Sequence, residues 1–64
     1  MTLIVHDRAD GKVWKKLTDA VEIAAETRRL AELLERQVED VRDDLVCGLT
    51  LATVGAAYTL TLDP

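Results

Sequence analysis

The residues of this chain that could do chemistry are few, and they do not form a catalytic pattern. The single histidine, His6, is followed by Asp7 and Asp10, a set that could serve as a weak metal site or an acid–base pair. Three ligands within five residues of a turn lack the rigid scaffold and the supporting hydrogen bonds that metal sites use. Aspartates at a turn more often accept hydrogen bonds from the backbone. We therefore predict a polar turn here and no metal site.

The single cysteine, Cys47, is the only other candidate for reactive chemistry. It lies in an apolar stretch, directly after Val46. Such a thiol is typically a small buried side chain at the end of a helix, which is unreactive. The glycines are isolated and form no phosphate-binding loop, and no Ser-His-Asp set can be assembled around His6, the only histidine. The sequence therefore predicts a protein that is not an enzyme and holds no cofactor.

The length and charge of the chain favour a protein partner. The chain has 64 residues, with eight basic and twelve acidic side chains and a net charge of −4. A domain of this size buries only about 60% of its unfolded surface, and small scaffolds usually need disulfides, a metal or a partner. One cysteine cannot form an intrachain disulfide, so association is the expected source of further stability. The acidic balance argues against binding to nucleic acid.

The elements that would position these residues fall into three segments, and residues 1–17 form the first. Leu3, Ile4 and Val5 suit a short strand. Asp10-Gly11 is a strong turn dipeptide, because both residues tolerate positive φ. We predict a strand or β-hairpin with its turn, the alternative being a strand and a loop that leads into a helix near Lys12.

Residues 18–47 predict one long amphipathic helix, from about residue 19 to 46. Asp19 followed by Glu22 resembles a capping box, and Gly48 is placed for a left-handed C-cap. Such a helix would be about 40 Å long. The apolar stripe drifts, since Gln37 stands seven residues after Leu30, which disfavours a strict coiled coil. Each stripe residue has another member three or four positions away, with one gap between Ala24 and Leu30: Leu17, Ala20, Ile23, Ala24, Leu30, Ala31, Leu34, Val38, Val41 and Leu45.

The third segment has no charged side chain between Leu45 and Leu62. Threonine alternates with leucine or alanine in it, which is typical of strands. We predict a C-terminal β-hairpin over residues 48–62, with strands at 49–54 and 57–62. Two alternatives are a membrane span over residues 45–62, which the acidic flanks disfavour, and a continued buried helix.

The three segments together predict an α+β fold that forms oligomers. A helix of about 40 Å overhangs any sheet built from strands of five or six residues, so part of its stripe would be exposed. We expect this stripe to bind a second copy or a larger assembly. The predicted interface residues are Ile23, Leu30, Leu34, Val38, Val41 and Leu45.

The charges at the two ends of the predicted helix oppose its dipole. Lys15 and Lys16 stand near its start, whereas Asp40, Asp43 and Asp44 stand near its end. An antiparallel partner helix would place the lysines of one chain beside the aspartates of another. These five residues are the predicted charged contacts of the interface.

The sequence thus predicts a non-enzymatic structural or interaction protein that self-associates, such as a subunit of a virus particle. One alternative is a small acidic regulatory binder resembling an inhibitor or an antitoxin. Another is a single-span membrane protein anchored by residues 45–62. We expect a cytoplasmic protein, or one built into a particle that assembles there, because no secretory signal precedes His6.

Overall fold

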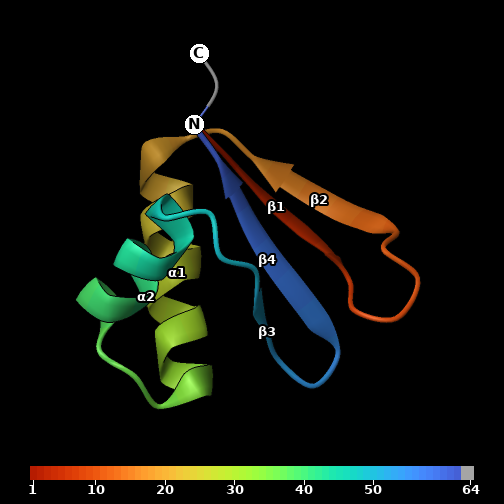
Figure 1. Ribbon diagram of the computed structural model, residues 1–64. Coiled ribbons are helices and arrows are strands. Elements are labelled where there is room, and N and C mark those ends of the chain that lie inside the picture. The colour runs from red at the N-terminus through yellow and green to blue at the C-terminus, as the bar shows by residue number, and fades with distance from the viewer. Residues whose placement is uncertain (63–64) are drawn as a thin grey trace.

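Two helices cover one face of a four-stranded antiparallel sheet in the computed structural model, which describes residues 1–62 (Figure 1). The strand order is β2-β1-β4-β3, so the first and last strands of the chain are neighbours at the centre of the sheet. The predicted α+β class is confirmed. The elements are β1 (Thr2–Asp7), β2 (Val13–Leu17), α1 (Ala20–Leu34), α2 (Val38–Val46), β3 (Leu51–Ala52) and β4 (Ala56–Thr61).

Alternation along β1 and β4 decides which side chains face the helices. Leu3 of β1 pairs with Leu60 of β4, and Val5 pairs with Tyr58. All four side chains are buried, whereas Ile4, between Leu3 and Val5, points to the other face and is half-buried. Because successive side chains of a strand point to opposite faces, one face of the sheet is covered and the other is open.

The predicted N-terminal hairpin is confirmed. Gly11 adopts a φ of 77° in the turn, and β1 pairs with β2 in antiparallel register. The register shifts between Val5 and His6, which leaves Trp14 without a partner and creates a bulge. The β2 strand extends beyond the helices, and only Leu17 among its residues is half-buried rather than exposed (Figure 1).

The prediction of one long helix over residues 19–46 is wrong, because the chain leaves the helical path after Leu34. Glu35 adopts the left-handed conformation, with φ 55° and ψ 44°, and its N–H and that of Arg36 donate to the carbonyls of Glu32 and Ala31. A second helix, α2, then begins at Val38. The described chain measures only 30 × 28 × 19 Å, so a straight helix of about 40 Å would extend beyond the fold and leave part of its stripe uncovered.

The predicted helix ends are confirmed at both outer positions. The Asp19 carboxylate accepts a hydrogen bond from the Glu22 N–H at 3.1 Å, so Asp19 is the N-cap of α1. After α2, Gly48 adopts a φ of 91°, and the N–H of Leu49 donates to the carbonyl of Asp44. Glycine tolerates this left-handed position without a steric cost, which is why it stands there.

The C-terminal segment forms the predicted hairpin, with a shorter first strand than expected. β3 spans only Leu51–Ala52, and it pairs with β4 in antiparallel register. Residues 45–62 therefore do not form one continuous helix. No helix within residues 1–62 has both the length and the apolar character that crossing a membrane requires.

The core lies between the helices and the covered face of the sheet. Leu30 of α1 and both Val41 and Leu45 of α2 are 0–1% exposed. They pack in one cluster with Leu3 of β1, which is also fully buried. The two halves of the sequence stripe thus meet the same sheet, since the break at Glu35 folds α2 back beside α1.

Candidate binding groove between the two helices

The histidine and aspartates considered as a metal or acid–base site, His6, Asp7 and Asp10, are part of the sheet and its first turn. A ring nitrogen of His6, Nε2, lies 3.3 Å from the Thr59 hydroxyl on the open face of the sheet. The Asp7 carboxylate accepts the N–H groups of Ala9 and Asp10 at 2.7 and 3.1 Å. These aspartates order the turn, as the sequence predicts. Within residues 1–62, no three of the His, Cys, Asp and Glu side chains gather in a way that could hold a metal ion.

Cys47 is exposed, contrary to the prediction of a buried thiol. It is the C-cap of α2, two residues after Leu45. Two residues along a helix amount to a rotation of about 200°, so Cys47 points away from the side on which Leu45 is buried.

The predicted interface residues lie mainly in the core of this same chain. Ile23, Leu30, Val41 and Leu45 are buried, and Leu34 and Val38 are half-buried against the core. The sheet covers the stripe because the helix breaks, so no long overhang remains to bind a partner. The rationale for an interface at the stripe is therefore removed by the fold.

The predicted charged contacts are also arranged differently. Lys15 and Lys16 belong to the strand β2 rather than to a helix start. The Lys15 ammonium lies 3.6 Å from the Glu26 carboxylate of α1, and Arg36 lies 2.7 Å from Asp44. These two ion pairs within the chain tie β2 to α1 and the interhelical turn to α2. No ion pair within residues 1–62 involves Lys16, Asp40 or Asp43.

Tyr58 is buried in the core of the sheet, close enough to α1 for the charges of Glu26 and Arg29 to act on its hydroxyl. Burial raises the pKa of Tyr58 above its ordinary value of 10.0, the nearby Glu26 charge raises it further, and Arg29 lowers it. A raised pKa means that the folded protein favours the neutral phenol. The stability that this preference contributes is fully present below pH 10 and is lost as the pH rises through the folded value.

Tyr58 is the only tyrosine of the chain, so its titration can be followed alone. We expect tyrosinate absorbance of the native protein to rise at a higher pH than that of the urea-unfolded protein. The free energy of unfolding should fall more steeply above pH 10 in the wild type than in Tyr58→Phe. Equal slopes in the two proteins would show that Tyr58 titrates as a solvated phenol.

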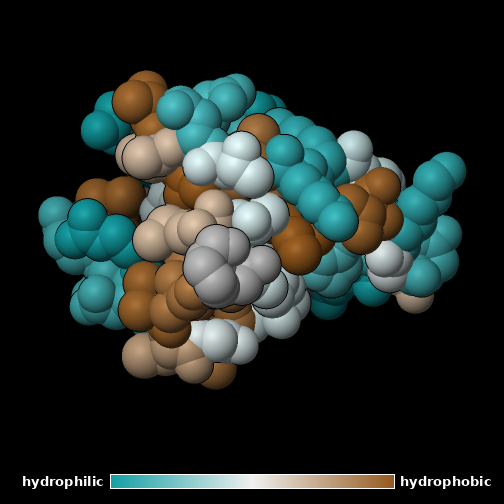
Figure 2. Space-filling view, turned by 90° about the horizontal axis from the view of Figure 1, so that it is seen from above, coloured by the Kyte–Doolittle hydropathy of each residue, from teal (hydrophilic) through white to brown (hydrophobic). Residues whose placement is uncertain are grey.

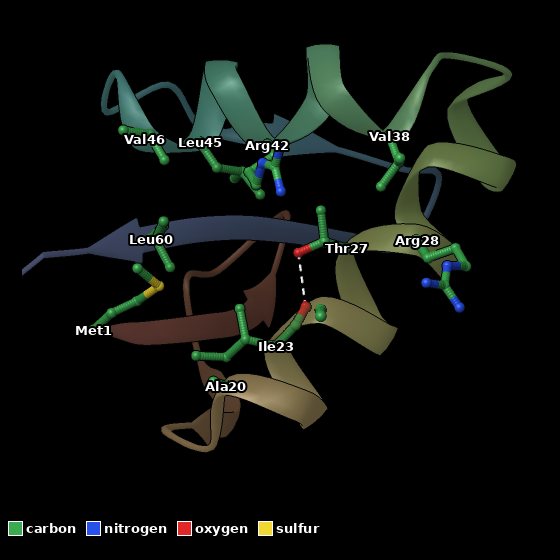
Figure 3. A pocket seen from close by; sticks show the side chains of 11 residues that line it. Met1, Ala20, Ile23, Thr27, Arg28, Val38, Arg42, Leu45, Val46 and Leu60 are labelled. Atoms are coloured by element: carbon green, nitrogen blue, oxygen red, sulfur yellow. Dashed lines mark hydrogen bonds between the residues drawn. The ribbon is translucent and has the colours of Figure 1, made fainter.

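An apolar groove runs between α1 and α2 and ends at β4 (Figure 3). Its volume is about 280 Å³. The helices leave this gap because small residues stand where they face one another, Ala20 and Ala24 on α1. The Thr27 hydroxyl donates to the carbonyl of Ile23 at 2.7 Å, so it is already satisfied within the groove wall. The groove is lined by Met1, Ala20, Ile23, Ala24, Thr27, Arg28, Val38, Arg42, Leu45, Val46 and Leu60.

Two arginines belong to the groove, and the sequence analysis did not single them out. In Figure 3 the Arg42 side chain extends from α2 toward the middle of the groove, and Arg28 stands on α1 near the Val38 end. Both are exposed, and neither forms an ion pair or a hydrogen bond with residues 1–62. The signal in the sequence was weak, because arginines on a helix surface are ordinary. Only the break at Glu35 brings the two helices together.

Exposed apolar side chains gather at the end of the molecule where the groove opens. Met1 precedes β1 and Leu62 follows β4, and these strands pair so that both residues lie at the same end. Val46, at the end of α2, lines the groove together with Met1, and Leu49 follows two residues after the C-cap of α2. We call Met1, Val46, Leu49 and Leu62 the apolar end surface; each is 45–56% exposed. Figure 2 looks onto this end and shows hydrophobic side chains gathered there.

No family model, curated protein or solved structure matches the chain. The groove and the apolar end surface are therefore interpreted from their own geometry and chemistry.

Proposed function

We propose that this protein is a non-enzymatic interaction protein that self-associates through its apolar end surface. The observation that carries the proposal is the exposure of Met1, Val46, Leu49 and Leu62 at one end of the molecule, where Met1 and Val46 line the open groove. Soluble monomers rarely expose contiguous apolar surface of this kind without a function for it. A domain of 64 residues also gains more from a partner than a larger domain would.

Charge supports a second copy as the partner. Each chain carries a net charge of −4, so two copies repel each other over most of their surfaces. The stretch from Leu45 to Leu62 has no charged side chain, and it supplies three of the four residues of the apolar end surface. Among residues 1–62, the charged side chains that line the groove are Arg28 and Arg42, which are positive. Two copies therefore meet with least repulsion at this end, most simply in a two-fold dimer.

The proposed self-association surface differs from the one that the sequence predicted. The self-association surface expected from the sequence was the helix stripe, whose residues now pack against the sheet. The apolar end surface takes its place because Val46 and Leu49 lie beyond the last core position of α2, Leu45. Their exposure results from the end of the helix and the short β3, which leave nothing of residues 1–62 above them.

Val46→Asp tests the proposal, with Val54→Asp as the matched control. Val46 belongs to the apolar end surface, whereas Val54 is 96% exposed in the β3–β4 turn at the opposite end of the sheet. Burying an unpaired carboxylate in a contact costs about 2 kcal/mol or more, which raises a dissociation constant roughly 30-fold. We expect Val46→Asp to weaken the dimer by at least this factor and Val54→Asp to leave it unchanged.

Molar mass as a function of concentration, measured by sedimentation or light scattering, gives both dissociation constants. Circular dichroism should show the same fold in both variants, since both substituted residues are exposed. A wild-type protein that stays monomeric at submillimolar concentration would refute the proposal. Equal weakening by the two variants would place the contact elsewhere.

A further inference from the structure

We propose that the groove between α1 and α2 binds a free alkyl carboxylate of about eight to ten carbons, with its carboxylate at Arg28 and Arg42. This goes beyond self-association, because it assigns a small-molecule ligand to the groove itself. Three properties of the groove carry the inference: its volume, its apolar lining and its two arginines.

The volume sets the size of the ligand. A cavity of about 150 Å³ is known to accommodate benzene, which has six carbons. By proportion, the groove of about 280 Å³ accommodates roughly eleven non-hydrogen atoms. A chain of eight to ten carbons fills it when the carboxylate stays at the rim. Aromatic ligands of two rings would fill the same volume, but the groove is an elongated gap between two helices and suits a linear chain better (Figure 3).

The lining makes the groove suitable for an alkyl chain. Among the described residues that line it, Thr27 is the only polar side chain besides the two arginines, and its hydroxyl already donates within α1. The wall is built from aliphatic side chains, including Ile23 of α1 on one side, Leu45 of α2 on the other and Val46 at the open end (Figure 3). Such a surface offers dispersion contacts and removal of apolar area from water, and it offers no further hydrogen bond that a polar ligand would need.

The arginines select the head group. Arg28 and Arg42 form no ion pair with residues 1–62, in a chain whose acidic side chains outnumber its basic ones. A guanidinium presents two parallel N–H donors that match the two oxygens of a carboxylate. A neutral alcohol of the same chain length would make the same contacts with the apolar wall, but it lacks the two oxygens that pair with the guanidinium donors.

Figure 3 gives the direction of the bound chain. Met1, Val46 and Leu60 stand at one end of the groove, Arg42 stands over its middle, and Arg28 lies toward the other end. A carboxylate held at the arginines therefore directs its alkyl chain toward Leu60 and the apolar end surface. The terminal carbons would then contact Val46, which the proposed dimer also uses.

Decanoate, kept below its micelle-forming concentration, is the probe that tests this inference. Amide chemical shifts of the ¹⁵N-labelled protein are followed during the titration, and decan-1-ol serves as the uncharged comparison. We expect saturable shifts at groove residues such as Ala24 and Val46, and binding of decanoate about ten-fold tighter than of decan-1-ol. Absence of saturable shifts, or equal affinity for the acid and the alcohol, would overturn the inference.

Substitutions test the arginines at the rim and the apolar wall of the groove separately. Arg42→Gln and Arg28→Gln should each weaken decanoate binding about five-fold, whereas Arg29→Gln, on the same helix but outside the groove, should leave it unchanged. Ala24→Phe should fill the groove and abolish the binding of both ligands. Equal effects of Arg28→Gln and Arg29→Gln would mean that only the overall charge matters, and would overturn the assignment.

The test stands independently of the proposed dimer. The molar mass of each titrated sample is measured, and the protein is kept at a concentration where it is monomeric. If the protein never self-associates, decanoate binding still decides the inference. If it does self-associate, decanoate should lower the mass, because ligand and partner share Val46.

Discussion

Leu45→Ala is expected to lower the free energy of unfolding by about 3 kcal/mol, a large part of the stability of a domain this small. Leu45 is 1% exposed and packs in the core cluster beneath α2. Truncation removes three buried carbons and leaves a cavity that the sheet cannot collapse to fill, because β1 and β4 are fixed by their pairing. Urea unfolding followed by circular dichroism measures the loss.

Val46→Ala is the matched control for this prediction. Val46 is the next residue of the same helix, and 45% of it is exposed. Its truncation should lower the free energy of unfolding by less than about 1 kcal/mol, because little buried area is lost. A larger loss at Val46 than at Leu45 would mean that α2 turns a different side to the sheet.

Glu35→Gly is expected to raise the free energy of unfolding by about 1 kcal/mol, although glycine usually destabilises helices. Glu35 holds a φ of 55°, and in residues 1–62 it is the only residue other than glycine with a positive φ. A left-handed conformation costs a residue with a Cβ roughly 1–2 kcal/mol, which glycine avoids, while glycine gives the unfolded chain somewhat more freedom. The exposed Glu35 side chain forms no ion pair with residues 1–62 that would be lost.

Glu32→Gly provides the opposite result from the same substitution. Glu32 is exposed within α1, three residues before the break, where glycine should lower the free energy of unfolding by about 1 kcal/mol. The free energies of unfolding of the two variants should therefore differ by about 2 kcal/mol, one lying above the wild-type value and the other below it. Thermal or urea unfolding measures both. A loss of stability in both variants would show that α1 and α2 form one continuous helix in solution.

Features controlled by neighbouring residues could be predicted from the sequence. The turn at Asp10-Gly11 and the cap at Asp19 depend on side chains that bond to backbone groups within three residues. Gly48 adopts its positive φ for an equally local reason. The alternation of threonine with apolar residues likewise predicted strand structure in the last segment, and β4 follows it.

The helix break could not be predicted with the same means, because no glycine or proline marks it. Residues 34–37 read Leu-Glu-Arg-Gln, all compatible with a helix. The one local sign was the drift of the stripe at Gln37, which we interpreted as a straight helix rather than as two helices. Gln37 is in fact the N-cap of α2, without a side-chain hydrogen bond.

The candidate groove could be predicted least of all. Its walls come from α1, α2, β4 and Met1, which are brought together only by the break and by the pairing of β1 with β4. No spacing in the sequence places Arg28 and Arg42 on one groove, or Val46 and Met1 at the same end of it. The intrachain ion pairs could not be predicted for the same reason, since Lys15 and Asp44 each meet a partner that lies in another element of this chain.

The sequence by itself determined the α+β class, both hairpins, the outer ends of the helical region and the identity of the apolar stripe. Each of these follows from interactions over a few residues or from periodicity along one element. The tertiary structure alone decided that the stripe is divided at Glu35 and buried against the sheet. The physical reason is that a single helix would leave much of its apolar face in water, and burying both halves outweighs the cost of about 1–2 kcal/mol for a left-handed glutamate.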